Sequence, residues 1–249
     1  MVLENLIATG NTADIYLHDS KIIKLFKDFL PDSEAEYEAK KQIFARSKGL
    51  SVPYVYEVTE INRRQAIIME YTPGETIGKI IFDDMTKAER YISLSVDVQL
   101  KIHDVKASGF ELMTDKLTRQ IASSLILDEN QRNALIEKLH AMQYEKRLCH
   151  GDYHVFNLIL TETGVMVIDW VDSSAGDTKA DAYRSYLLYS QYSTELADLY
   201  IRLYCEKSGL SQDDIFAWEP IVAGARLAEN VASENAGRLL EIVKRHCTL

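Results

Sequence analysis

The chain has 249 residues, of which 47% are hydrophobic and 27% are charged, so it can form one large domain or two small lobes of a soluble globular protein. Its net charge of −10 disfavours a nucleic-acid partner, because an acidic surface repels phosphate backbones, and it tolerates a cationic small molecule. We expect a cytoplasmic protein without a signal peptide or membrane segment, and free thiols at Cys149, Cys205 and Cys247.

The first 71 residues predict an antiparallel sheet that carries one helix. The helix is predicted from Ser33 to Ser47, with a capping box between Ser33 and Glu36 at its start and Gly49 after its end. The strands are short runs rich in β-branched and aromatic residues, separated by turn residues, at 5–10, 13–19, 21–26, 54–61 and 65–71.

The rest of the chain is mostly helical, with one exception. Helical periodicity covers about 86–105, about 128–142 and most of 179–247. Residues 148–170 instead predict short strands and loops, which would form a β island in the helical part. We therefore predict an N-terminal lobe of residues 1–71, a hinge at 72–75 and a C-terminal lobe of residues 76–249, with a ligand site in the cleft between the lobes.

The stretch "LCHGDYHVFNLIL", residues 148–160, carries the most polar side chains between apolar ends. One interpretation is a zinc site at His150 and His154, but the other histidines are scattered and zinc needs further ligands at suitable spacing. A second is a nucleophilic pair of Cys149 and His150. Adjacent side chains on a strand point to opposite faces, so these two could not form a hydrogen bond, and Cys149 is more simply a core thiol.

A third interpretation is phosphoryl transfer. Asp152 and Asn157 have the Asp-x-x-x-x-Asn spacing of a kinase catalytic loop, in which the aspartate is the base and the asparagine binds magnesium. Asp169, at the end of the apolar run "VMVIDW", supplies the second acidic group that this chemistry requires. Asn157 and Asp169 offer the hard oxygen ligands that Mg²⁺ prefers.

The third interpretation also requires particular residues in the first lobe. Lys24 lies on the third predicted strand, and Glu38 lies on the predicted helix in a row of small residues that could face the sheet. The turn that would close over the phosphates is Gly10, Asn11 and Thr12, and the strand end that would pass the base is Glu70, Tyr71 and Thr72. Each feature alone is weak evidence, and the conjunction in this order carries the hypothesis.

Residues 150–157, "HGDYHVFN", resemble the His-Gly-Asp-x-His-x-x-Asn motif of the aminoglycoside phosphotransferase and choline kinase-like family, and "VIDW" at 167–170 resembles its second metal motif. The resemblance covers nearly the whole chain. It implies an α+β, bilobal, protein-kinase-like fold, with a small antiparallel β lobe and a larger helical lobe whose β island carries the catalytic loop. Two departures are Val155-Phe156, where many relatives have Pro-Gly, and a first loop with a single glycine.

The resemblance also implies residue roles. Asp152 would accept or orient the proton of the acceptor hydroxyl, and Asn157 and Asp169 would hold Mg²⁺. Lys24 would contact the α- and β-phosphates of ATP or GTP, steadied by Glu38. The base would meet residues 70–72 mainly through backbone groups, Asp181 would brace the catalytic loop, and His154 would either support that loop or be purely structural.

The acceptor remains open at this point. A small-molecule kinase would transfer the γ-phosphoryl group to a hydroxyl of an aminoglycoside, or alternatively of choline, a sugar, homoserine or a similar metabolite. A non-catalytic nucleotide-binding pseudokinase is the alternative from another class. Glu229 could bind a substrate amino group or be an exposed helix carboxylate, and both a monomer and a homodimer fit the sequence.

Overall fold

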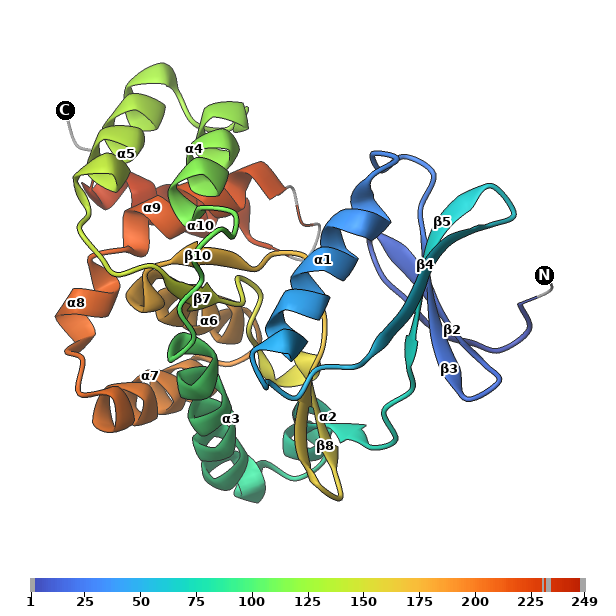
Figure 1. Ribbon diagram of the computed structural model, residues 1–249. Helices are drawn as coiled ribbons and strands as arrows, with labels where there is room; N and C mark the ends of the chain where they lie inside the picture. Colours follow the sequence, from blue (N-terminus) through green and yellow to red (C-terminus); the bar gives the residue numbers. More distant parts are fainter. Residues whose placement is uncertain (1–2, 230, 232–233, 247–249) are drawn as a thin grey trace. The chain divides into compact units, whose positions relative to one another are not determined.

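The computed structural model describes residues 3–229, 231 and 234–246 of the chain (Figure 1). The chain divides into two compact units. The first consists of the chain up to Asp83 together with Val155–Asp172, and the second consists of Asp84–His154 together with the chain from Ser173 onward. No helix of the described residues has the length and hydrophobicity needed to cross a membrane.

The first unit contains the predicted antiparallel sheet, whose five strands are arranged in the order β1-β2-β3-β5-β4. Its strands are β1 (Leu6–Thr9), β2 (Ala13–His18), β3 (Lys21–Phe26), β4 (Val55–Ile61) and β5 (Arg64–Glu70). Helix α1 (Glu34–Ser47) follows β3 and lies along this sheet in Figure 1.

Alanines form part of the buried face of α1. Ala35 and Ala39 pack in one core cluster with Phe26, Ile67 and Met69 of the sheet, because methyl side chains let the helix approach the strands closely. The predicted orientation of this helix toward the sheet is therefore confirmed.

The predicted capping box at the start of α1 is wrong. Ser33 has φ −101° and ψ 3° rather than an extended conformation, and its side chain makes no capping hydrogen bond. The Glu36 carboxylate instead pairs with Lys40 one turn later, at 3.2 Å. The helix still begins at the predicted position, because two acidic residues in its first turn favour that end of the helix dipole.

The first unit has a second sheet, which contains the end of the 148–160 stretch. It has the order β6-β8-β9, with β6 (Glu75–Thr76), β8 (Leu158–Thr161) and β9 (Gly164–Val167), and it is accompanied by helix α2 (Ile77–Asp83) and the 3-10 turn η2 (Val155–Asn157). The ring of Phe156 stacks on Phe82 at 5.6 Å and covers Gly78, where an added Cβ would come within 2.5 Å of that ring. Phe156 thus fixes the shape of the turn by packing.

The second unit is mainly helical, with a two-stranded antiparallel sheet of β7 (Arg147–Cys149) and β10 (Ser174–Gly176). Its helices are α3 (Ala88–His103), α4 (Met113–Ser123), α5 (Glu129–Ala141), α6 (Thr178–Tyr192), α7 (Thr194–Ser208), α8 (Gln212–Phe216), α9 (Glu219–Arg226) and α10 (Ala236–His246), with 3-10 turns η1 (Met85–Lys87) and η3 (Leu227–Glu229). Ser193, Gly209 and Ser211 break the predicted helical region 179–247, because they cap or end α7 and α8.

Candidate active site

Three charged side chains meet in the first unit. The Lys24 Nζ on β3 lies 2.7 Å and 2.8 Å from the two carboxylate oxygens of Glu38 on α1, and 3.0 Å from Oδ1 of Asp169. Lys24 is only 7% exposed and Glu38 only 1% exposed. Charges buried to this extent require partners, so the ion pair fixes the position of the ammonium group.

The two carboxylates determine the charge of Lys24. Burial alone would lower the pKa of Lys24, but the negative charges of Asp169 and Glu38 outweigh this effect and raise the pKa above its ordinary value. Burial raises the pKa of Glu38, against the opposing effect of Lys24. Lys24 is therefore a cation at neutral pH and can neutralise an anionic ligand.

Asn157 and Asp169 lie at the same end of the β8–β9 hairpin. Leu158 pairs with Val167, and the next backbone contact beyond that pair is a 3.0 Å hydrogen bond from the Ile168 N–H to the Asn157 carbonyl oxygen. Asp169 then turns sharply with φ +63°, and its side chain is 40% exposed. An amide oxygen and a partly exposed carboxylate form a donor set that suits Mg²⁺.

A cavity of about 520 Å³ lies within the first unit and includes this charged cluster. Its lining comprises apolar residues of the sheet and its surroundings, the three charged residues and the strand end after β5: Ile7, Ala8, Ile15, Leu17, Ile22, Lys24, Glu38, Gln42, Pro53, Met69, Glu70, Tyr71, Thr72, Gly74, Thr76, Ile159, Ile168 and Asp169. A mostly apolar cavity with a few converging polar groups is the usual form of a small-molecule site.

Residues 70–72, at the end of β5 and directly after it, line the cavity and include one buried hydroxyl. The Glu70 carboxylate accepts a 2.9 Å hydrogen bond from the Tyr54 N–H, so this side chain is already engaged. Thr72 is 8% exposed, and its buried Oγ1 has no hydrogen-bond partner among the described residues. The predicted Gly10–Thr12 turn connects β1 and β2 next to the lining residue Ala8, and within the described chain it does not line the cavity itself.

Asp181 on α6 holds residues 150–154 of the second unit, the polar loop, through hydrogen bonds to its backbone. Its carboxylate accepts hydrogen bonds from the His150 N–H at 3.2 Å and the Gly151 N–H at 2.7 Å, and it pairs with His103 Nε2 at 2.9 Å. Burial would raise the pKa of Asp181, but the hydrogen bonds from His103 and Gly151 outweigh it and lower the pKa. These contacts are those expected of a residue that braces the loop.

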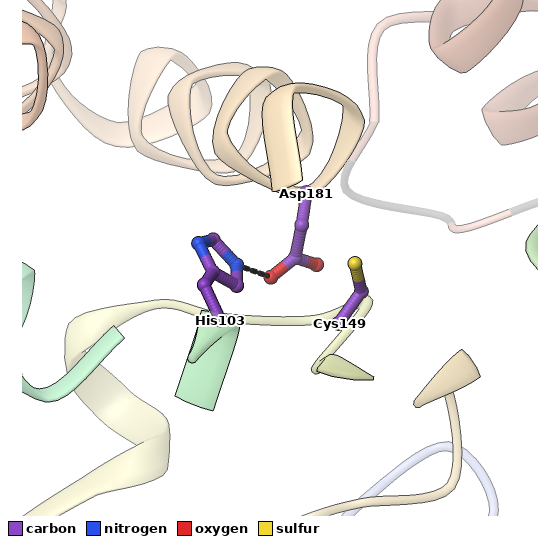
Figure 2. A group of neighbouring side chains, drawn as sticks. All are labelled: His103, Cys149 and Asp181. Carbon is purple, nitrogen blue, oxygen red and sulfur yellow. Dashed lines mark hydrogen bonds and ion pairs between the residues drawn. The ribbon is translucent and has the colours of Figure 1, made fainter. Parts of the chain in front are cut away.

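Figure 2 shows Asp181 in a group of possible metal ligands among the described residues, namely His103, Cys149 and Asp181. Both nitrogens of His103 are engaged, because its Nδ1 lies 2.8 Å from the Tyr204 hydroxyl. Burial raises the pKa of the Cys149 thiol well above its usual value, so the thiol is protonated at neutral pH in this core. The geometry favours a hydrogen-bonded core cluster over a metal site at these three residues, which are not the His150 and His154 of the zinc interpretation.

Asp152 lies beside two basic side chains of the second unit. Its carboxylate is 3.4 Å from His154 Nε2 and 3.9 Å from an Arg184 terminal nitrogen. Burial would raise the pKa of Asp152, but the hydrogen bond and charge of His154, followed by the charges of Arg184 and His150, outweigh it and lower the pKa. Asp152 is thus a carboxylate at neutral pH.

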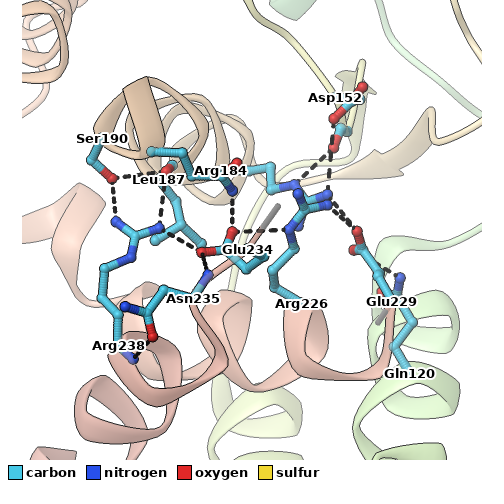
Figure 3. Close-up of polar contacts among 12 residues, drawn as sticks. Gln120, Asp152, Arg184, Leu187, Ser190, Arg226, Glu229, Glu234, Asn235 and Arg238 are labelled. Carbon is cyan, nitrogen blue, oxygen red and sulfur yellow. Dashed lines mark hydrogen bonds and ion pairs between the residues drawn. The ribbon is translucent and has the colours of Figure 1, made fainter. Parts of the chain in front are cut away.

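The sequence does not reveal the charged cluster next to Asp152, which Figure 3 shows. Glu229 is neither an exposed carboxylate nor unpaired, since it accepts hydrogen bonds from Arg184 at 2.8 Å, from Gln120 at 3.3 Å and from Arg226. The signal that could have revealed Arg184 is its place among apolar residues in "AYRSYLL", because a buried guanidinium needs a partner.

Solved structures share the fold of the chain. An aminoglycoside phosphotransferase APH(4)-Ia thermostable mutant, in a ternary complex with AMP-PNP and hygromycin B, superposes with a TM-score of 0.73 at 13% identity, covering 100% of this chain and 96% of that one. A choline/ethanolamine kinase family protein from Mesorhizobium loti gives 0.64 at 14% identity, covering 99% and 87%. LicA in complex with AMP gives 0.67 at 17% identity, covering 99% and 92%. The predicted protein-kinase-like fold is confirmed.

Sequence comparison is consistent with this fold. No curated protein sequence matches the chain at a significant level. A family model described as the phosphotransferase enzyme family, APH, matches residues 6–220. This range is most of the chain and includes the motifs at 150–157 and 167–170. The chain therefore belongs to the APH phosphotransferase enzyme family.

Proposed function

We propose that the chain is a small-molecule kinase that transfers the γ-phosphoryl group of ATP or GTP to a hydroxyl group of a small acceptor. The observation that carries the proposal is the pairing of Lys24 with Glu38 and Asp169 in the lining of a cavity of about 520 Å³. Solved complexes of the structural neighbours contain AMP-PNP or AMP, which supports a nucleotide as the ligand of this cavity.

In this proposal the first unit binds the nucleotide. The apolar lining would receive the base, the backbone of Glu70–Thr72 would contact its edge, and the orphaned Thr72 hydroxyl would gain a polar partner. Lys24, held by Glu38, would neutralise the α- and β-phosphates, and the Gly10–Thr12 turn would close over them. Asn157 and Asp169 would hold Mg²⁺, which when bound neutralises charge on the phosphates.

Asp152 is proposed to act on the acceptor. The acceptor hydroxyl would donate a hydrogen bond to the Asp152 carboxylate, which would orient it and take up its proton. The hydroxyl oxygen then forms the new bond to the γ-phosphorus, and the bond between that phosphorus and the β–γ bridging oxygen breaks to release the nucleoside diphosphate. The lowered pKa of Asp152 supports this role, because only the carboxylate form can take up the proton of the hydroxyl.

The acceptor is the least defined part of the proposal. Glu229 was a candidate for binding a substrate amino group, but Arg184 and Arg226 already neutralise it. This pairing gives no support to a cationic acceptor at that position, so neutral acceptors such as sugars must be tested alongside aminoglycosides, choline and homoserine.

The test is a coupled assay for ADP or GDP release with this acceptor panel, run on the wild-type chain and on Asp152→Asn. We expect acceptor-dependent release by the wild type and its loss in Asp152→Asn, with unchanged nucleotide affinity by calorimetry. Nucleotide binding without release with any acceptor or with water would support a pseudokinase instead, and near-normal turnover of Asp152→Asn would refute the assignment of the base.

A further inference from the structure

We propose that Arg184 is a positioning residue for Asp152 and that Glu229 sets its distance from that carboxylate. This inference rests on the proposed role of Asp152. It concerns only residues of the second unit, where Arg184 extends from α6 toward the polar loop and Glu229 from the turn η3 (Figure 3).

Arg184 contacts the loop in two ways. Its Nε donates a 3.2 Å hydrogen bond to the carbonyl oxygen of Gly151, the residue directly before Asp152. A terminal nitrogen of the same guanidinium lies 3.9 Å from Oδ1 of Asp152. Arg184 is 8% exposed, so packing restricts its movement. One planar group therefore fixes the backbone before Asp152 and faces its carboxylate.

Glu229 holds the guanidinium away from Asp152. The Arg184 nitrogen that faces Asp152 donates a 2.8 Å hydrogen bond to Oε2 of Glu229, whereas its 3.9 Å separation from Asp152 is longer than a hydrogen bond. Glu229 is itself fixed by Arg226 and by Gln120 at 3.3 Å. The consequence is an ionised Asp152 that is not captured in a close salt bridge with Arg184 and can accept a hydroxyl proton.

The remaining charges around this cluster lie on several elements. His154 faces the other carboxylate oxygen of Asp152 at 3.4 Å. Glu234 pairs with Arg226 at 3.3 Å and with Arg238 at 3.0 Å. Arg238 also donates hydrogen bonds to the Ser190 hydroxyl and to the Leu187 carbonyl oxygen, on the side of the cluster remote from Asp152. Arg238 thus provides a matched control, because it is a paired arginine of the same cluster that does not face Asp152.

Removing Arg184 and removing the charge of Glu229 should both lower kcat, for opposite reasons. Arg184→Met removes the group that positions Asp152 and should lower kcat by roughly 100-fold, the usual effect of a misplaced catalytic group. Arg184→Lys keeps the charge and should recover part of this loss. Glu229→Gln removes the negative charge that anchors Arg184, so that Arg184 should pair more closely with Asp152 and kcat should also fall. Nucleotide KM should change little in all three variants.

The experiment measures ADP release from Mg²⁺-ATP, with water as acceptor and with any acceptor found in the panel. It is run on each single variant and on the double variant that combines Arg184→Met with Glu229→Gln. Because Glu229 is inferred to act through Arg184, the double variant should be no slower than Arg184→Met alone. Arg238→Met should keep wild-type kcat. Circular dichroism and thermal melting establish that each variant is folded, and the comparison of Arg184→Lys with wild type remains informative if Arg184→Met does not fold.

The outcomes separate this inference from the proposed function. Equal ADP release by the wild type and Asp152→Asn, or none by either, would overturn the proposed function and this inference with it. Loss in Asp152→Asn with wild-type kcat in Arg184→Met, or in Arg184→Lys if only that variant folds, would overturn the role of Arg184 alone. Multiplicative losses in the double variant, or an equal loss in Arg238→Met, would show that the cluster acts only as general structural support.

Discussion

Lys24, Glu38 and Asp169 are separated in the sequence but meet in the folded chain. The Lys24 Nζ lies 2.7 Å from a carboxylate oxygen of Glu38 and 3.0 Å from one of Asp169. The contact between Lys24 and Glu38 was predictable, because both residues lie on elements with clear patterns and an established kinase role links them. Arg184 was not predictable as a neighbour of Asp152, since nothing in local periodicity states which loop a helix residue faces. The sequence thus anticipates pairs that belong to a known motif and misses pairs that depend on packing alone.

Replacing Lys24 should weaken both binding and stability. In Lys24→Met, Glu38 would be a buried carboxylate without its ammonium partner, a change that typically costs about 3–5 kcal/mol. We therefore expect a lower melting temperature and at least a tenfold weaker affinity for Mg²⁺-ATP in calorimetry. Lys79→Met is the control, because Lys79 is an exposed lysine that also pairs with two carboxylates. Equal effects of the two substitutions would contradict a special role for Lys24.

Replacing Asp169 should affect the metal dependence of binding. Asp169→Ala removes one of the two proposed Mg²⁺ ligands and also one partner of Lys24. Titration with ATP in the presence and absence of Mg²⁺ should show a large metal effect for the wild type and little for the variant. Asp172→Ala, three residues later on the same segment, should retain the metal effect. An unchanged Mg²⁺ effect in Asp169→Ala would remove this residue from the metal site.

At the scale of elements, the sequence predicts the first sheet and its helix well, but the 11-residue helix α4 lies outside the stretches with predicted helical periodicity. All five strands of the first sheet and helix α1 lie where the sequence predicts them. Helix α2 and strand β10, with 7 and 3 residues, are too short for a period to be distinguished. Their positions follow from tertiary contacts, such as the pairing of β10 with β7.

The segment that follows β5 depends on a glycine. Gly74 has φ +150°, and an added Cβ would lie 2.1 Å from the Leu160 carbonyl oxygen, a backbone atom that cannot move aside easily. Gly74→Ala should therefore lower the melting temperature and weaken ATP affinity, since Gly74 lines the cavity. Gly49→Ala is the control, because Gly49 also has a positive φ of +82° but open space around it, so only a conformational cost of about 1 kcal/mol applies. Equal melting temperatures for the two variants would argue against the clash.

At the scale of the whole molecule, 13–17% identity to the neighbours described above is enough to share one fold but not a substrate. The fold follows from binary patterning, which the sequence shows directly, whereas the partners of a side chain such as Glu229, which pairs with Arg184, are revealed only by the folded chain. The hinge at residues 72–75 and the roles of the individual site residues remain predictions.

Acid should destabilise the protein in part through Asp181. Burial acts to raise its pKa, but hydrogen bonds from His103 and Gly151 lower it below the ordinary value of 3.8. The unfolded chain therefore binds a proton more readily, so the stabilisation is present above about pH 4 and is lost as the pH falls through the folded-state pKa. Asp181→Asn should lower the melting temperature at pH 7, by about 2–4 °C per kcal/mol lost, and show a shallower decline between pH 5 and pH 3 than the wild type.

The control for this prediction is Asp198→Asn, which changes an exposed carboxylate on α7 by the same chemistry. It should leave both the melting temperature at pH 7 and the decline in acid close to those of the wild type. The Asp181 carboxylate accepts hydrogen bonds from the His150 and Gly151 N–H groups, so loss of its charge should also loosen the loop before Asp152. Faster amide hydrogen exchange at His150 and Gly151 would report this loosening. A parallel acid decline in Asp181→Asn and wild type would show that other carboxylates dominate, and unchanged exchange at residues 150 and 151 would show that the loop does not depend on Asp181 for its order.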